Sequence, residues 1–211
     1  MNSEMRYEKQ VDKSNYEFGR YMSKERWCRI WHQLDEIKKL NPENILEVGP
    51  GAGVFKATAA MFGMKVETMD FDPDLKPDHV ASATAMPFRA NTYDAVCAFQ
   101  MLEHLPYDAS LQAFAEMVRV SRRFVVISLP DARRVWRYRL YIPKKGAVEL
   151  LVPRPQIRAP NHEFNGEHYW EVNKRLHPLK RIVDDFTAHI SLVKTYRVPE
   201  IPYHRFFVFQ H

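Results

Sequence analysis

The stretch Ile45-Leu46-Glu47-Val48-Gly49-Pro50-Gly51-Ala52-Gly53-Val54-Phe55 decides the fold of this chain. Residues 44–48 are predicted to form a short buried strand, and a helix is predicted to begin near Ala52 or Gly53. The three glycines between them allow positive φ and a close approach of the backbone to a ligand. The first turn of such a helix points its N–H groups and its positive dipole end at whatever lies in the turn. The stretch therefore predicts a strand–turn–helix unit that binds a nucleotide-like ligand.

The spacing of the glycines separates two kinds of nucleotide site. The dinucleotide fingerprint is G-x-G-x-x-G, whereas the third glycine of this chain, Gly53, comes one residue earlier. Pro50 also lacks the N–H group that a pyrophosphate would use. The pattern therefore disfavours a dinucleotide-dependent oxidoreductase and has the form E-x-G-x-G-x-G, which begins at Glu47.

The composition predicts one soluble domain. The chain has 211 residues, of which 45% are hydrophobic and 27% are charged. A chain of this length and composition can bury a hydrophobic core that needs no disulfide bonds or metal ions for stability. It contains no apolar run long enough to span a membrane and no signal-peptide pattern at its N-terminus. Cys28 and Cys97 fit neither a metal motif nor a disulfide framework. We therefore expect a protein of a reducing, cytoplasmic compartment.

The net charge of +5 raises the question of nucleic-acid binding. The basic residues, however, concentrate after residue 130 and do not follow the whole chain. A local basic patch fits an acidic small substrate or a membrane surface as well as RNA. We expect a small molecule as the main partner and disfavour nucleic acid; the sequence does not indicate an oligomeric state.

The segment before the glycine motif predicts an arm and a helix over residues 1–43. Residues 1–22 are polar and aromatic, and either a flap or a loosely ordered arm fits them. Ser23 is a good N-cap for an amphipathic helix that ends before Asn41. We expect Trp27 and Trp31 of this helix to contact the sheet as part of the core.

The segments after the motif alternate between strand and helix patterns. Strands are predicted over residues 65–70, 79–82, 92–99, 124–129, 190–197 and 204–210, and helices over residues 57–62, 111–120 and 178–186. The last two strands are joined by a short connection, so they should form an antiparallel hairpin. The prediction is an α/β fold with a seven-stranded, mostly parallel sheet, one antiparallel edge strand, and helices on both faces.

Asp70 closes the predicted second strand, 21 positions after Gly49. A parallel β-α-β unit places an acidic residue at this spacing beside the end of the first strand. Its carboxylate can accept hydrogen bonds from two vicinal ribose hydroxyls, although a solvated aspartate at a strand end is the alternative. Phe71, the next residue, is expected to lie along an adenine face.

Five elements in a fixed order resemble a known family. They are the glycine motif, Asp70, Met86-Pro87-Phe88, Tyr93-Asp94-Ala95-Val96 and Met101-Leu102-Glu103-His104-Leu105. Over residues 44–130 this order resembles the methyltransferase 11 type of the class I S-adenosylmethionine-dependent methyltransferases. The resemblance implies a single Rossmann-like domain over residues 1–211. It also implies an enzyme that methylates an oxygen or nitrogen nucleophile of a small or medium-sized acceptor; the alternative is a binding or scaffold protein with the same fold.

The resemblance further implies where S-adenosylmethionine binds. The implied donor-site residues are Glu47, Gly49, Gly51, Gly53, Asp70, Phe71, Ser82, Ala83, Gln100 and Met101, with the last two on the methionine half. Ser82 departs from the family, which often has an aspartate there for the adenine amine. A serine hydroxyl makes a weaker hydrogen bond to that amine.

Residues 131–171 form an insertion that a bare methyltransferase core does not need. Arg133 to Tyr141 alternate basic with apolar or aromatic side chains, and two lysines follow. In the family such an insertion builds the acceptor pocket, which implies an acceptor-site cap packed near the N-terminal helix. The implied acceptor-binding residues are Trp136, Tyr138, His162 and Tyr169. Contact with a membrane surface and an ordinary solvated hairpin are the two alternatives.

The segment 161–171 is the densest cluster of titratable and aromatic groups in the chain. Histidine titrates near neutral pH and can take a proton from an acceptor. We predict His168 as the catalytic base and His104 as the second candidate, with purely structural hydrogen bonds as the alternative. His162 and His168, together with Glu163 and Glu167, could also be metal ligands. The two histidines are six residues apart in an apparent loop, however, which matches no standard zinc pattern, so no metal is expected.

Overall fold

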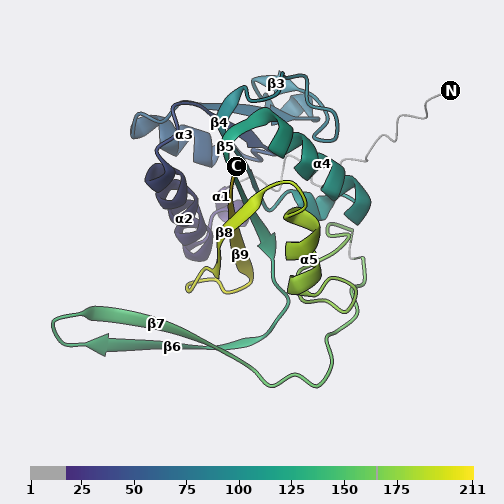
Figure 1. The fold of residues 1–211 in the computed structure, drawn as a ribbon. Coiled ribbons are helices and arrows are strands. Elements are labelled where there is room, and N and C mark those ends of the chain that lie inside the picture. The colour runs from purple at the N-terminus through teal and green to yellow at the C-terminus, as the bar shows by residue number, and fades with distance from the viewer. Residues whose placement is uncertain (1–17, 165) are drawn as a thin grey trace.

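A seven-stranded sheet forms the centre of the computed structural model, which describes residues 18–164 and 166–211 (Figure 1). The strand order is β3-β2-β1-β4-β5-β9-β8. The strands are β1 (Ile45–Val48), β2 (Val66–Asp70), β3 (His79–Val80), β4 (Tyr93–Phe99), β5 (Ser121–Pro130), β8 (Ser191–Arg197) and β9 (His204–Gln210). Strands β1 to β5 are parallel, whereas β9 runs antiparallel to both β5 and β8.

This architecture confirms the predicted α/β fold and the final antiparallel hairpin. One antiparallel strand was predicted at the edge of the sheet. The antiparallel strand is β9, which lies one position in from the edge, and β8 forms the edge itself. The carboxyl ends of the parallel strands meet at one edge of the sheet. In open α/β sheets that edge carries the ligand site.

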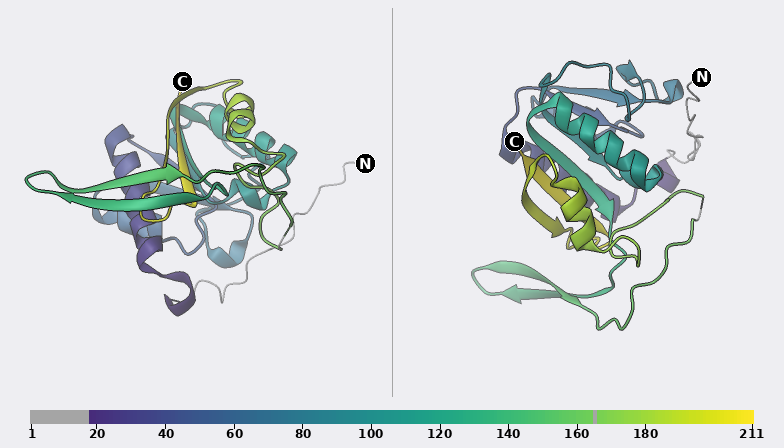
Figure 2. Two further views of the ribbon diagram at one scale, coloured as in Figure 1. Left: turned by 90° about the horizontal axis from the view of Figure 1, so that it is seen from below. Right: turned by 45° about the vertical axis from the view of Figure 1, so that its right-hand side comes forward.

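Helices cover both faces of the sheet (Figures 1 and 2). They are α2 (Lys24–Leu40), α3 (Val54–Met61), α4 (Tyr107–Val120) and α5 (Leu179–Phe186), besides the short elements α1 (Phe18–Tyr21), η2 (Pro73–Leu75) and η3 (Leu102–His104). Buried side chains of α4 and α5 share one core cluster, and those of α2 and α3 share a second. Strand β4 is buried on both faces, which explains why its residues other than Asp94 are apolar or aromatic.

Helix α2 begins and ends where predicted, but the side of the helix that packs against the sheet is not the predicted one. The Ser23 side chain accepts a hydrogen bond from the Arg26 amide at 3.1 Å, as expected of an N-cap. The prediction that Trp27 and Trp31 belong to the core is wrong, because they are 52% and 58% exposed. The helix instead packs its Ile30–Ile37 side against the sheet, and the tryptophans lie on the next stripe of the helix surface.

A two-stranded ribbon projects from the domain. It consists of β6 (Val135–Ile142) and β7 (Gly146–Pro153), which pair antiparallel and extend beyond the body of the molecule in every view (Figures 1 and 2). We call it the β6–β7 hairpin. Arg137 ties it to the loop between β8 and β9 by donating to the Glu200 carbonyl oxygen at 2.8 Å. Most of the predicted N-terminal arm lies outside the described residues. No described helix is both long and apolar enough to cross a membrane.

Strand β1 buries a carboxylate in this core. Glu47 is only 3% exposed, and its Oε2 has no hydrogen-bond partner among the described residues. Burial raises the pKa of Glu47 from 4.5 to about 8, although the Lys56 side chain and backbone amide favour the charged form. The ionised form is therefore unfavourable in the folded protein.

Replacing Glu47 by glutamine should change the pH dependence of stability. The folded wild type holds a proton on Glu47 up to about pH 8, so the contribution of this group to stability is largest at acidic pH and falls as the pH rises from about 4.5 through 8. Glu47→Gln removes this loss and should be more stable than wild type at pH 8.5 by about 1–3 kcal/mol, with a much smaller difference at pH 5. Urea unfolding at both pH values measures it.

Glu67→Gln on the neighbouring strand is the matched control. Hydrogen bonds from Tyr93 and His79 lower the pKa of Glu67, so this variant should lose stability at neutral and alkaline pH. An advantage of Glu47→Gln that is equal at both pH values would contradict the burial argument.

Candidate active site

The turn between β1 and α3 adopts the conformation that the glycine motif predicts. Gly49, Gly51 and Gly53 have φ values of +73°, +54° and +71°, in the left-handed region that favours glycine. The Gly49 amide donates to the Met69 carbonyl oxygen at 2.9 Å, which ties the turn to β2. A Cβ atom on Gly49 would lie 2.4 Å from Cγ of Met101. The turn after β1 is therefore in direct contact with the segment after β4.

The ends of β2 and β3 lie beside this turn. Val48 of β1 pairs with Met69 of β2, so Asp70 follows directly at the same edge. Asp70 Oδ1 accepts from the Asp72 amide at 2.9 Å, and the Asp70 carbonyl oxygen accepts from Ala81 at 2.9 Å. These bonds hold the Asp70 loop against the start of the Ser82 loop.

Two other predicted donor-site residues differ in their surroundings. Phe71 is half exposed, as a residue that contacts a ligand face would be. Ser82 Oγ lies 2.9 Å from the hydroxyl of Thr84 and accepts from its amide at 3.3 Å. The Ser82 hydroxyl is thus already engaged within its own loop.

The segment after β4 turns sharply before η3. Gln100 has a φ of +55°, which is unusual for a residue with a side chain. Its amide donates to the Ser128 carbonyl oxygen at 3.0 Å, so β5 holds the turn in place. The turn brings Met101 against Gly49 and directs the chain into η3.

Glu103, His104 and His168 form a cluster that we call the η3 cluster. One ligand atom from each lies within 4.8 Å of the others. Glu103 is 0% exposed, and neither of its carboxylate oxygens has a hydrogen-bond partner among the described residues. Burial raises the pKa of Glu103 to about 7, while His168 and Arg29 favour its charged form. The His104 and His168 rings meet edge to face at 5.1 Å.

Each histidine of the η3 cluster is oriented through Nδ1. His104 Nδ1 donates to the Glu167 carbonyl oxygen at 3.0 Å, and burial together with His168 lowers the pKa of His104. His168 Nδ1 lies 3.2 Å from Glu171 Oε1. Burial disfavours a charge on His168, but the carboxylates of Glu171 and Glu103 outweigh it and raise its pKa.

Glu171 is itself held by a second donor. The Tyr203 hydroxyl donates to Glu171 Oε1 at 2.6 Å. Burial disfavours its charge, but bonds from His168 and Tyr203 hold the pKa of Glu171 at about 2. Glu103, Glu171 and Tyr203 were not predicted from the sequence as residues of the functional site. Glu103 was visible within the motif of residues 101–105, whereas no local pattern connects Tyr203 to that motif.

The four predicted acceptor residues fall into two groups. His162 Nε2 donates to the His168 carbonyl oxygen at 2.7 Å, and the Tyr169 amide donates to the Glu103 carbonyl oxygen at 2.8 Å. These two residues lie beside the η3 cluster. Trp136 and Tyr138 lie on the β6–β7 hairpin, where they are largely exposed.

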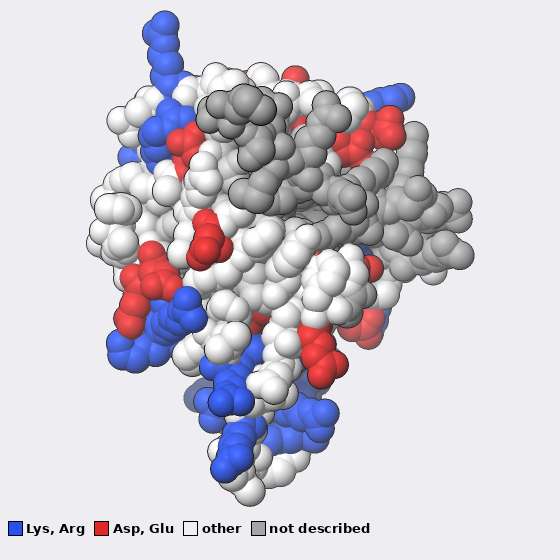
Figure 3. Space-filling model, turned by 90° about the vertical axis from the view of Figure 1, so that its right-hand side faces the viewer, with Lys and Arg blue, Asp and Glu red and all other residues white. Residues whose placement is uncertain are grey.

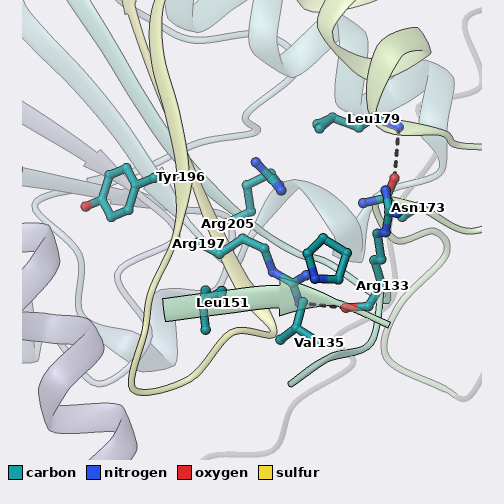
Figure 4. A pocket seen from close by; sticks show the side chains of 9 residues that line it. Arg133, Val135, Leu151, Asn173, Leu179, Tyr196, Arg197 and Arg205 are labelled. Atoms are coloured by element: carbon teal, nitrogen blue, oxygen red, sulfur yellow. Dashed lines mark hydrogen bonds between the residues drawn. The ribbon is translucent and has the colours of Figure 1, made fainter. Parts of the chain in front are cut away.

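A cavity of about 350 Å³ lies at the root of the hairpin (Figure 4). It is lined by Arg133, Val135, Leu151, Pro153, Asn173, Leu179, Tyr196, Arg197 and Arg205. The buried Asp131 neutralises part of this arginine cluster, since Arg205 Nε donates to its Oδ2 at 2.7 Å and Arg197 Nε lies 3.6 Å away. These contacts fix the point where the chain leaves β5.

Comparison with known proteins agrees with this geometry. A family model described as a methyltransferase domain matches residues 18–177. No curated protein matches the sequence. The type 11 subtype stays a prediction, because the matching model gives the broader family.

Solved structures give the same fold. PH0226 from Pyrococcus horikoshii OT3 has a TM-score of 0.62 and 15% identity, covering 95% of this chain and 99% of that one. A Burkholderia thailandensis 1,6-didemethyltoxoflavin-N1-methyltransferase, solved with S-adenosylhomocysteine, has a TM-score of 0.61 and 15% identity over 93% of this chain and 84% of that one. The small RNA methyltransferase HEN1 has a TM-score of 0.59 and 11% identity over 88% of this chain and 25% of that one. The chain therefore belongs to the methyltransferase domain family, and its fold is that of the class I S-adenosylmethionine-dependent methyltransferases.

Proposed function

We propose that this methyltransferase moves the methyl group of S-adenosylmethionine to an oxygen or nitrogen nucleophile that binds beside the η3 cluster. The observation that carries the proposal is the contact between Gly49 and Met101. It joins the glycine turn, where the donor would bind, to the segment that leads into Glu103 and His104. Donor and acceptor would thus meet at the carboxyl end of β4.

The residues on the donor side fit S-adenosylmethionine. The three left-handed glycines keep side chains out of the turn, and Asp70 stands at the strand end where ribose hydroxyls are bound in such folds. Glu47 offers a buried oxygen that has no hydrogen-bond partner in the described part of the chain. When bound, S-adenosylmethionine supplies an electrophilic methyl group. The protein's own part is then largely to align an acceptor atom with it.

The acceptor side offers two groups for a proton. His168 is our candidate base, because Glu171 orients its Nδ1 and leaves Nε2 as the nitrogen with the lone pair. His104 is the second candidate, oriented in the same way by the Glu167 carbonyl oxygen. His162 and Tyr169 are held next to them and would contact the acceptor.

The acceptor is proposed to be a small molecule. The Burkholderia thailandensis neighbour is a small-molecule methyltransferase, whereas HEN1 acts on small RNA. Acidic and basic side chains are mixed over the face in Figure 3, and Lys and Arg are most frequent toward its lower end, at the height of the hairpin in Figure 1. A continuous basic track for a nucleic-acid backbone would look different.

Replacing Asp70 by alanine should weaken binding of the donor and of S-adenosylhomocysteine. Loss of hydrogen bonds to a charged acceptor costs on the order of 1–3 kcal/mol, which is about 5-fold to 150-fold in Kd. Titration calorimetry with S-adenosylhomocysteine measures it. Asp184→Ala, which removes an exposed carboxylate on α5, is the control and should bind as wild type does. Binding of NAD without binding of S-adenosylmethionine would refute the donor assignment.

Replacing His168 by alanine should lower turnover by roughly 10²–10⁴-fold with little change in donor affinity, as expected for loss of a general base. The substrate is found first, by screening cell metabolites and RNA for transfer of labelled methyl. His189→Ala, an exposed histidine before β8, is the control. A loss of only a few-fold would leave alignment as the whole mechanism, and a chain that binds the donor but labels nothing would be a binding protein.

For the β6–β7 hairpin we propose contact with an anionic lipid surface. One of its faces is apolar on both strands, because Trp136 pairs with Val152, Tyr138 with Leu150 and Leu140 with Val148. Val152 is partly buried, whereas the other five side chains are 40–54% exposed. Lys144 and Lys145 follow at the tip. Aromatic and apolar side chains with adjacent lysines match the headgroup region of such a surface.

Flotation with vesicles tests the hairpin. Wild type should float with vesicles that contain phosphatidylserine and much less with neutral vesicles. Leu140→Glu should abolish flotation, because it places a charge in the apolar face. Ile157→Glu changes a fully exposed residue outside the hairpin and should float as wild type does. Absence of flotation would favour the alternative that Trp136 and Tyr138 cap the acceptor.

A further inference from the structure

We propose that the η3 cluster is a binding site for a divalent transition-metal ion of the Zn²⁺ type, with Glu103, His104 and His168 as its protein ligands. The sequence alone predicts no metal site, because His162 and His168, with Glu163 and Glu167, match no standard zinc spacing. The fold brings Glu103 and His104 from η3 together with His168 from the distant return segment. The proposal deepens the proposed function, because it rests on an acceptor at the same place.

The strongest sign is the environment of Glu103. Its side chain is entirely buried, yet both carboxylate oxygens lack a hydrogen-bond partner among the described residues. A buried carboxylate without a partner costs free energy unless a proton or a cation compensates it. Its backbone is fixed, since its carbonyl oxygen accepts from the Tyr169 amide at 2.8 Å. The chain thus holds, beside two histidine rings, a buried carboxylate that accepts no hydrogen bond from the described residues.

The histidines have the outer contacts of metal ligands. A ligating histidine commonly donates its other ring N–H to a carboxylate or a backbone carbonyl, which sets the tautomer. Both arrangements occur here: His168 Nδ1 bonds to the Glu171 carboxylate, and His104 Nδ1 bonds to the Glu167 carbonyl oxygen. In each ring this contact places the N–H on Nδ1 and the lone pair on Nε2.

The donor set indicates the class of ion. Two imidazoles and one carboxylate suit Zn²⁺ and neighbouring first-row ions better than Mg²⁺ or Ca²⁺, which prefer oxygen donors. Three donors around one such ion are at most about 4.4 Å apart, since each lies about 2.0–2.2 Å from it. The three ligand atoms lie within 4.8 Å of one another, so the side chains would move closer together around a bound ion.

The surrounding charges agree with a cation. The Glu171 carboxylate lies 3.2 Å from His168 Nδ1, and Glu167 lies in the same segment. The positive groups are Arg29, whose Nη1 is 3.4 Å from His204 Nε2, and Lys174, whose Nζ is 3.7 Å from Glu171 Oε2. Neither makes a hydrogen bond to Glu103 in this structure.

Three protein ligands leave room for a further ligand. An acceptor hydroxyl there would have its pKa lowered by the cation. Its proton would leave to solvent as the oxygen forms its bond to the methyl carbon and the sulfur takes the electron pair of the broken bond. The substrate class would then be an oxygen nucleophile, and both histidines would be ligands in place of bases.

Cobalt titration of the full chain, treated first with a chelator, tests the site. Wild type should bind one Co²⁺ per chain with visible absorption, Zn²⁺ should displace it, and Mg²⁺ should not. Glu103→Gln and His168→Ala should each weaken Co²⁺ binding well over tenfold. Glu171→Gln should weaken it by about tenfold or more, as expected for an outer partner. His189→Ala, an exposed histidine, is the control and should bind as wild type does.

Two readouts keep the outcomes apart. Circular dichroism and S-adenosylhomocysteine affinity should be unchanged in Glu103→Gln, which shows that the variant folds. No Co²⁺ binding, or binding that Glu103→Gln and His168→Ala leave intact, would overturn the metal site. Full methyl transfer by the metal-free chain would overturn the role of the cation in methyl transfer, while the proposed function stands. Metal binding without any donor binding would instead overturn the proposed function and keep the site.

Discussion

The contact between Gly49 and Met101 is the constraint on which the rest of the site depends. A side chain on Gly49 would collide with Met101, so the turn after β1 and the turn after β4 can approach only because the first lacks a Cβ atom. The second turn has its own unusual geometry, a positive φ at Gln100 that is held by β5. Together they bring the proposed donor site within reach of the buried acid and the histidines.

Much of this arrangement could be predicted from the sequence, because it follows from local patterns. The glycines predict left-handed turns, the apolar runs predict buried parallel strands, and Asp70 falls at a spacing set by one β-α-β unit. The cap at Ser23 is equally local. Each of these features depends on residues that are close together in the chain.

The features that escaped prediction depend on contacts between distant segments. Periodicity gave the length of α2 but not the side that faces the sheet, so Trp27 and Trp31 were misplaced. The place of β9 inside the sheet depends on pairing with β5, some 80 residues earlier in the chain. Glu103 lay within a recognised motif, but its burial and its distance to His168 come only from the return of the chain after the hairpin.

The ion pairs at Asp131 have a consequence for how this enzyme can diversify. Asp131 is buried at the end of β5 and bonds to Arg205, Asn173 and the Arg133 amide. Asp131 therefore holds together the two ends of the segment that contains the β6–β7 hairpin: the point where the chain leaves β5, and Asn173, where it returns to the domain. Beyond this clamp the ribbon packs little against the body (Figure 2). Evolution can lengthen, shorten or exchange the ribbon as a module, and the catalytic edge of the sheet need not change with it.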